Sequence, residues 1–160
     1  GGRIMKLDSF DSAILDELQN SGRLSYAELG ERIGLSKTPC WKRVQKLELE
    51  EVITGYRAEI NPRKIGLDLH VFLHITIKHT LAEKFEAAIN DFDQIIDCFA
   101  ITGDSDYMVS VIASDIDQFD ELIRYRFPQL PGVERVSTTM CLRTIKSGGK
   151  IPIRVAGIGA

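Results

Sequence analysis

The stretch SYAELGERIGLSKTPCWKRVQKL, residues 25–47, has the pattern of two short helices joined by a tight turn. Ser25 and Glu28 form an S-x-x-E capping box, which marks the start of the first helix. Gly34 follows the last apolar residue of that helix, where glycine enters the left-handed conformation without steric cost. Ser36 is a candidate N-cap for the second helix. The spacing of these residues predicts a helix-turn-helix.

The second helix of this pair has two unlike faces. Its apolar residues Cys40, Val44 and Leu47 recur at i, i+4 and i+7 and predict an inward face. Residues 36–47 include four basic residues and no acidic one, although the whole chain has a formal net charge of −3. A basic outer face suits a helix in the major groove of DNA, because phosphates attract Lys and Arg. A solvated basic face is also common on helices that bind nothing, so this local pattern leaves both interpretations open.

The composition, with 44% hydrophobic and 27% charged residues among 160, is ordinary for a globular protein. No apolar run approaches the roughly 20 residues that a membrane helix needs. No signal-peptide pattern is present, so we expect a cytoplasmic protein with no membrane partner. The three cysteines, Cys40, Cys98 and Cys141, are widely separated, which argues against a disulfide framework or a zinc site. We therefore expect no metal and no cofactor.

A first helix over residues 8–21, with Asp8 as N-cap, completes a three-helix unit with the helix-turn-helix. A connecting strand is expected over residues 52–60, where apolar and charged side chains alternate. The pattern beyond it predicts the order β-α-β-β-α-β, the ferredoxin-like arrangement, with a second capping box from Thr80 to Glu83. The expected elements of this arrangement span residues 70–78, 80–91, 95–102, 107–113, 115–127 and 133–145.

The expected fold class is therefore α+β. Residues 6–51 form an N-terminal three-helix helix-turn-helix domain, and residues 52–62 form a hinge strand and linker. Residues 63–150 form the C-terminal ferredoxin-like domain, and residues 151–160 form a tail whose role the pattern does not decide.

The strand over residues 70–78 predicts one unpartnered sheet face. Its outward positions are His70, Phe72, His74 and Thr76. A half-apolar sheet face usually packs on another sheet, so we expect a homodimer through this domain, which would also pair two DNA-reading helices. His70 and His74 are about 13 Å apart at the usual strand rise, too far to chelate one metal together.

The turn Gly103-Asp104-Ser105-Asp106-Tyr107 is a second candidate site. Gly, Asp and Ser are common turn residues, so an ordinary hairpin loop is one interpretation. The other is a site for an amino acid, because carboxylates accept hydrogen bonds from an α-ammonium and N–H or hydroxyl groups donate to an α-carboxylate. No catalytic triad pattern, P-loop or G-x-G-x-x-G is present, and we expect no enzyme.

Taken together, these motifs resemble the Lrp/AsnC family of leucine-responsive and asparagine-responsive (feast/famine) regulators. The resemblance covers about residues 6–150 and is carried by Asp8 to Leu18, GLSKTPCWKRVQKLE, VITGY, GDSDY and LPGV. It implies a winged or plain helix-turn-helix, a hinge strand and a β-α-β-β-α-β domain. It also implies dimers that assemble into octamers or similar oligomers, and an amino acid that binds between C-terminal domains and alters assembly or DNA affinity.

The resemblance implies two sets of site residues. The DNA-binding set is Ser36, Lys37, Thr38, Trp41, Lys42, Arg43 and Lys46. The effector-binding set is Gly103, Asp104, Asp106, Tyr107, Thr138 and Thr139. The implied partners are double-stranded DNA, an amino-acid effector and further copies of the chain, with leucine or another apolar amino acid favoured as effector. The resemblance does not supply the target DNA sequence, because Lys37 and Trp41 stand where family members vary.

Two other functional classes stay open at this stage. One is a small-molecule enzyme on the ferredoxin-like domain that uses the face of His70 and His74 with Asp104 or Asp106. The other is a ligand-binding protein whose helix-turn-helix only mediates contacts with proteins.

Overall fold

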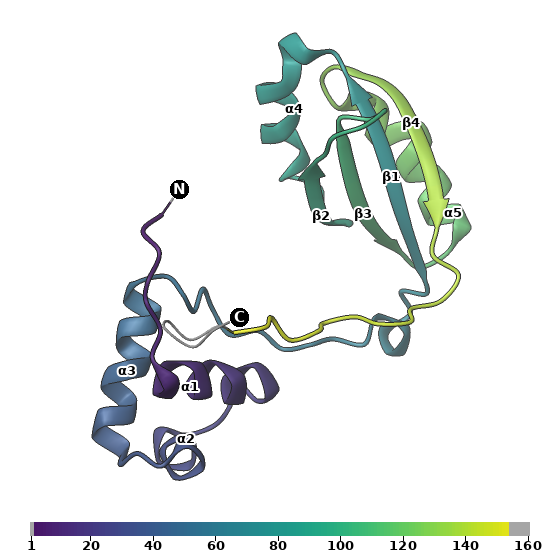
Figure 1. The fold of residues 1–160 in the computed structure, drawn as a ribbon. Coiled ribbons are helices and arrows are strands. Elements are labelled where there is room, and N and C mark those ends of the chain that lie inside the picture. Colours follow the sequence, from purple (N-terminus) through teal and green to yellow (C-terminus); the bar gives the residue numbers. More distant parts are fainter. Residues whose placement is uncertain (1, 154–160) are drawn as a thin grey trace. The chain divides into compact units, whose positions relative to one another are not determined.

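A computed structural model describes residues 2–153, which divide into two units (Figure 1). Each unit has a hydrophobic core of its own. One unit comprises the described residues up to Glu59 together with those from Lys146 onward. The other unit runs from Ile60 to Ile145. Most of the expected tail, residues 154–160, lies outside the described residues. No helix among the described residues has both the length and the apolar character needed to cross a bilayer.

The first unit is built on three helices. Their bounds are Ser9–Asn20 (α1), Tyr26–Ile33 (α2) and Lys37–Leu49 (α3). Asp8 and Asp11 cap the start of α1 reciprocally, and Ser25 and Glu28 do the same for α2. Gly34 ends α2 in the left-handed region with φ of +80°, as the sequence predicted. The local capping chemistry therefore places α2 and α3 at the expected turn.

The core of this helical unit is small. Its buried residues are Ile14, Leu15, Leu29, Cys40, Val44 and Leu47. Met5, Leu7, Ile53 and Ile153 pack against this cluster from outside the three helices. Three short helices bury little apolar surface, so segments before and after them enlarge the core.

The second unit is a four-stranded antiparallel sheet with two helices. Its strands are Leu69–Ile77 (β1), Ile95–Ala100 (β2), Tyr107–Ala113 (β3) and Val133–Met140 (β4). The strand order is β2-β3-β1-β4, and the helices are Ala82–Ile89 (α4) and Ile116–Glu121 (α5). This connectivity confirms the predicted β-α-β-β-α-β, ferredoxin-like arrangement.

Alternation along β1 separates the two faces of the sheet. Its buried side chains Val71, Leu73 and Ile75 pack in one cluster with Phe85 of α4 and Phe119 of α5. Both helices therefore cover the same face (Figure 1). The opposite face, which carries the alternate residues of β1, has no covering element from this unit.

The prediction of a strand over residues 52–60 is wrong, because no strand forms there. Helix α3 ends at Leu49, and residues 54–60 pair with no other described segment of the chain. A strand needs a neighbour to exchange backbone hydrogen bonds, and alternation alone does not supply one. The final strand is also shorter than predicted, because pairing with β1 stops at Met140 instead of continuing to residue 145.

The two helices of the sheet unit begin and end differently from the prediction. The capping box expected at Thr80 does not form, because residues His79–Leu81 make a 3₁₀ turn and α4 starts at Ala82. The helix expected over residues 115–127 is divided. α5 continues into a π-helical turn, Leu122–Arg126, and then a 3₁₀ turn, Phe127–Gln129, that contains a proline.

Candidate nucleic-acid interface and ligand site

The outer face of α3 presents most of the residues expected to read DNA. Cys40, Val44 and Leu47 are at most 1% exposed and hold α3 to the helical core. The expected DNA-binding residues that are exposed are Ser36, Lys37, Thr38, Trp41, Lys42 and Lys46. Ser36 stands at the N-cap position, but its side chain makes no capping hydrogen bond. Its hydroxyl therefore remains available to another partner.

Arg43 differs from the other residues of this set because it is half-buried and paired within the unit. Its Nη1 lies 2.6 Å from Oδ2 of Asp8 and 3.1 Å from Oδ1 of Asp11. The guanidinium carbon also lies 5.1 Å from the ring centroid of Phe10. The backbone N–H of Asp11 and then the Arg43 guanidinium lower the pKa of Asp8, while the hydrogen bond to Asp8 raises the pKa of Arg43. Arg43 thus joins α3 to the start of α1.

A groove of about 480 Å³ runs beside this ion pair. It is lined by Lys6, Pro39, Lys42 and Lys46 together with the paired acidic and basic groups. None of the three lysines forms a salt bridge with any other described residue. The groove therefore offers unpaired cationic groups. Lys6 was not predicted to take part, because no helical periodicity links it to α3.

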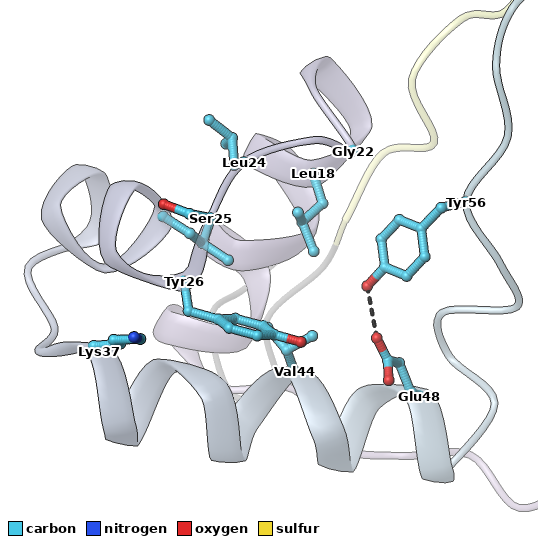
Figure 2. A pocket seen from close by; sticks show the side chains of 10 residues that line it. Leu18, Gly22, Leu24, Ser25, Tyr26, Lys37, Val44, Glu48 and Tyr56 are labelled. Carbon is cyan, nitrogen blue, oxygen red and sulfur yellow. Dashed lines mark hydrogen bonds between the residues drawn. The ribbon is translucent and has the colours of Figure 1, made fainter.

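A second hollow, of about 380 Å³, lies on the other side of α3 (Figure 2). Leu18, Leu29 and Val44 contribute to its apolar wall. Tyr56, from the segment after α3, donates its hydroxyl hydrogen to Oε1 of Glu48 at 2.8 Å. Figure 2 marks this hydrogen bond with a dashed line. Burial, followed by the Glu48 carboxylate, raises the pKa of Tyr56 far above its usual range. This contact ties the linker to the C-terminal end of α3.

A third hollow, of about 680 Å³, lies on the open face of the sheet unit. It is lined by His74, Ile101, Thr102, Asp104, Ser105, Arg135, Ser137 and Thr139. The register of β1 with β4 explains the grouping, since His74 lies opposite Ser137 and Phe72 opposite Thr139. Directly opposed residues of an antiparallel pair point to the same face.

The third hollow contains opposite charges from distant parts of the chain. Asp104 comes from the turn after β2, and Arg135 comes from β4. Neither forms a salt bridge with another described residue. Arg135 was not among the expected site residues, because only the pairing of Thr76 with Arg135 brings it to this face. The arrangement can receive a small molecule that carries both an anionic and a cationic group.

Other expected effector residues make contacts elsewhere in the sheet unit. Oδ2 of Asp106 accepts a hydrogen bond from the backbone N–H of Ile77 at 2.9 Å. Tyr107 is buried and donates to Oε1 of Glu86 at 2.6 Å. Burial and then Glu86 raise the pKa of Tyr107 to about 12.

Two further expected residues flank the third hollow without lining it. Thr138 lies opposite Leu73, which faces the helices, and Gly103 bends the turn with φ of +113°. The structure therefore brings Asp104 and Thr139 together, but not the other four residues of the expected set.

The histidines do not form a metal site. Nε2 of His70 lies 2.6 Å from Oγ of Ser110, and its ring centroid lies 4.7 Å from that of Phe72. Within residues 2–153, no group of three or more His, Cys, Asp or Glu side chains is arranged to hold a metal ion.

An exposed basic helix on a helix-turn-helix unit, joined to a ferredoxin-like unit with a polar hollow, defines a DNA-binding regulator with a separate ligand-binding domain. Two family models match the chain, one over the three helices and one over the sheet unit. Residues 7–48 match the AsnC-type helix-turn-helix domain, and residues 70–151 match the Lrp/AsnC ligand binding domain. The chain belongs to the Lrp/AsnC family of transcriptional regulators.

Relatives and solved structures agree with this assignment. The leucine-responsive regulatory protein of Salmonella typhimurium is 36% identical over 151 residues, which are 92% of each chain. A transcriptional regulator of Neisseria meningitidis, solved as a complex with L-Met, has a TM-score of 0.88 and 31% identity over 91% of this chain and 96% of its own. The leucine response regulatory protein of Mycobacterium tuberculosis has a TM-score of 0.80 and 29% identity, covering 91% of this chain and 99% of its own. These proteins are regulators, which confirms the predicted family and argues against the enzyme alternative.

Proposed function

We propose that this regulator binds double-stranded DNA through the outer face of α3, and that an amino acid in the third hollow modulates its DNA affinity or assembly. Membership of the family supports the general activity. The observation that carries the finer proposal is the meeting of Asp104 and Arg135 in one hollow on the open sheet face.

The DNA contact is proposed for a subset of the expected residues. Thr38, Lys42 and Lys46 lie away from the buried stripe of α3 and are exposed. Short polar groups near a helix N-terminus suit base edges, and lysines suit phosphates. Arg43 is proposed to act indirectly, because its two carboxylate partners already neutralise its charge and fix α3 against α1.

The effector chemistry follows from the charges that line the third hollow. Asp104 suits an α-ammonium group, and Arg135 suits an α-carboxylate, to which the hydroxyls of Ser137 and Thr139 can also donate. Ile101 supplies an apolar wall, which favours leucine, methionine or a similar side chain. The Neisseria meningitidis relative, whose solved complex contains L-Met, supports an apolar amino acid.

We further propose that the open sheet face joins two copies of the chain, with larger assemblies such as octamers built from these dimers. Phe72 and Met108 are partly exposed on this face, and Phe99 of the edge strand β2 is 51% exposed. Packing against a second sheet would remove this apolar surface from water. An effector in a hollow on the same face changes assembly or DNA affinity only if it binds one state more tightly than the other.

A thermal-shift panel of the twenty amino acids tests the effector proposal. A ligand that binds only the folded chain stabilises it by about 2.7 kcal/mol at a concentration of 100 Kd. We expect a raised melting temperature with one or two apolar amino acids, and no shift with the same ligands in Asp104→Asn. Thr139→Ala should weaken the shift, whereas the adjacent Thr138→Ala, on the helix side of β4, should retain it. A full shift in Asp104→Asn would place the effector elsewhere.

A further inference from the structure

Residues 150–153, after the last strand of the sheet unit, contact the helical unit, chiefly at α1. The side-chain amide of Gln19 donates from Nε2 to the carbonyl oxygen of Ile151 at 3.0 Å. Its Oε1 accepts a hydrogen bond from the N–H of the same residue at 2.7 Å. Both distances are normal for hydrogen bonds. One primary amide thus contacts both backbone groups of a single extended residue, as a neighbouring peptide group would in a sheet.

Two flanking contacts extend this recognition beyond the backbone. Nζ of Lys150 lies 4.0 Å from Oδ1 of Asp16, which is three residues before Gln19 and so on the same side of α1. Ile153 packs against the hydrophobic cluster of the helical unit. Backbone, charged and apolar groups of one short segment therefore meet complementary groups of the helical unit.

This docking gives the helical unit a second connection to the sheet unit, which is covalent along the chain at Lys146 and is held to α1 by non-covalent contacts. The chain leaves the helical unit after Glu59 and returns to it at Lys146. The outgoing connection is anchored on α3 by the hydrogen bond from Tyr56 to Glu48. The returning one is anchored on α1 by Gln19. A unit held through two helices has fewer orientations open to it than a unit on one flexible linker.

We propose that the side of α1 formed by Asp16 and Gln19 is a docking site for the chain's own C-terminal segment, residues 146–153, and that this second connection carries the ligand state of the sheet unit to the helix-turn-helix. The docking stands on the contacts alone. The coupling rests on the proposed function, because it requires an effector that changes DNA affinity. Gly148 and Gly149 lie within this segment, just before Lys150, the first residue that contacts α1, and keep the segment flexible when it is undocked.

Hydrogen exchange of the full-length chain tests the docking. The amide of Ile151 should be protected in the parent chain, because it donates to Gln19. In Gln19→Ala it should exchange about tenfold faster or more, since both hydrogen bonds to that residue are lost. Asn20→Ala is the matched control: Asn20 is the next residue of α1, is exposed, and its side chain takes part in no hydrogen bond with another described residue. Exchange of Ile151 at the rate of an unstructured peptide in the parent would overturn the docking.

The coupling is measured as the ratio of DNA dissociation constants with and without the amino acid identified by the thermal-shift panel. The ratio should fall towards one in Gln19→Ala and in Ile153→Ser. The second substitution weakens the docking contact from within the C-terminal segment and leaves the residues of α1 unchanged. It should be unchanged in Asn20→Ala. A parent-like ratio in both docking variants would overturn the coupling. A parent ratio of one would overturn the coupling together with the proposed function, while hydrogen exchange would still decide the docking.

Discussion

The two units of this regulator present their candidate sites in opposite ways. Among the described residues, the core of the helical unit has six buried hydrophobic residues, and Met5, Leu7, Ile53 and Ile153 from outside the three helices add further packing. The sheet unit has fourteen and leaves one sheet face uncovered. The proposed DNA site comes from consecutive turns of α3, whereas the proposed ligand site joins a turn and two strands. A small unit can thus present a surface along one element, while a larger one can gather a site from several.

The largest expected effect comes from a cavity in each core. Leu47→Ala in the helical unit and Leu73→Ala in the sheet unit each remove a side chain that is 0% exposed, and each should cost about 2–5 kcal/mol of stability. Leu47→Ala should abolish DNA binding, because the smaller core has little stability to lose. Hydrogen exchange of each unit is the measurement. If the amides of the sheet unit also lost protection in the Leu47→Ala variant, the two units would unfold together. That outcome would remove the contrast in stability between the two units.

A second prediction separates the exposed lysines of α3 from its paired arginine. Lys42→Ala with Lys46→Ala should weaken binding to all DNA sequences and reduce the slope of log affinity against log salt by about 0.9 per lost phosphate contact. Lys64→Ala with Lys84→Ala, in the sheet unit, is the charge-matched control and should leave the slope unchanged. DNA binding is measured by fluorescence anisotropy across a salt series.

Arg43→Ala should act on the fold, lowering the melting temperature while the salt slope of the remaining folded protein stays near that of the parent. If the slope of log affinity against log salt fell in Arg43→Ala by as much as it falls for the loss of one lysine, Arg43 would be a direct phosphate contact instead.

The smallest expected effect concerns Tyr107 and appears at high pH. Its pKa is raised from 10.0 to about 12 by burial and by the hydrogen bond to Glu86. A raised pKa stabilises the fold fully below pH 10, and this contribution is lost as pH rises towards 12. Tyr107→Phe should cost about 0.5–1.5 kcal/mol at neutral pH for the lost hydrogen bond. It should also flatten the decline in stability of the sheet unit between pH 10 and 12. Denaturant melts across this range would contradict the assignment if the two proteins declined in parallel.

The local features of the fold could be predicted because short stretches of sequence contain their causes. The N-cap at Asp8, the capping box at Ser25, the left-handed Gly34 and the alternation along β1 each depend on residues within a few positions of one another. The expected strand over residues 52–60 failed for the converse reason. Its alternation is local, but a strand also requires a pairing partner, and no segment within residues 2–153 pairs with it.

The candidate sites were predicted less completely than the fold. Two of the expected effector residues, Asp104 and Thr139, line the third hollow. Arg135 also lines it but was not predicted, because only the register of β4 with β1 brings it there. Asp106 and Tyr107 share the turn motif with Asp104, yet their side chains form hydrogen bonds outside the hollow. Asp106 accepts from the backbone N–H of Ile77, and Tyr107 donates to Glu86. Arg43 shares the basic stripe of α3, yet it pairs with residues more than 30 positions earlier.

The sequence by itself determined the helix-turn-helix, the order of strands and helices and the family, because these depend on periodicity, capping and motifs that are local in the chain. The tertiary structure decided which basic residue of α3 is paired, which residues of the turn face the hollow, and where residues 150–153 lie. Those outcomes depend on contacts between residues far apart in sequence, such as Gln19 with Ile151, which are 132 positions apart. No local pattern encodes such contacts, since they form only when packing brings the two segments together.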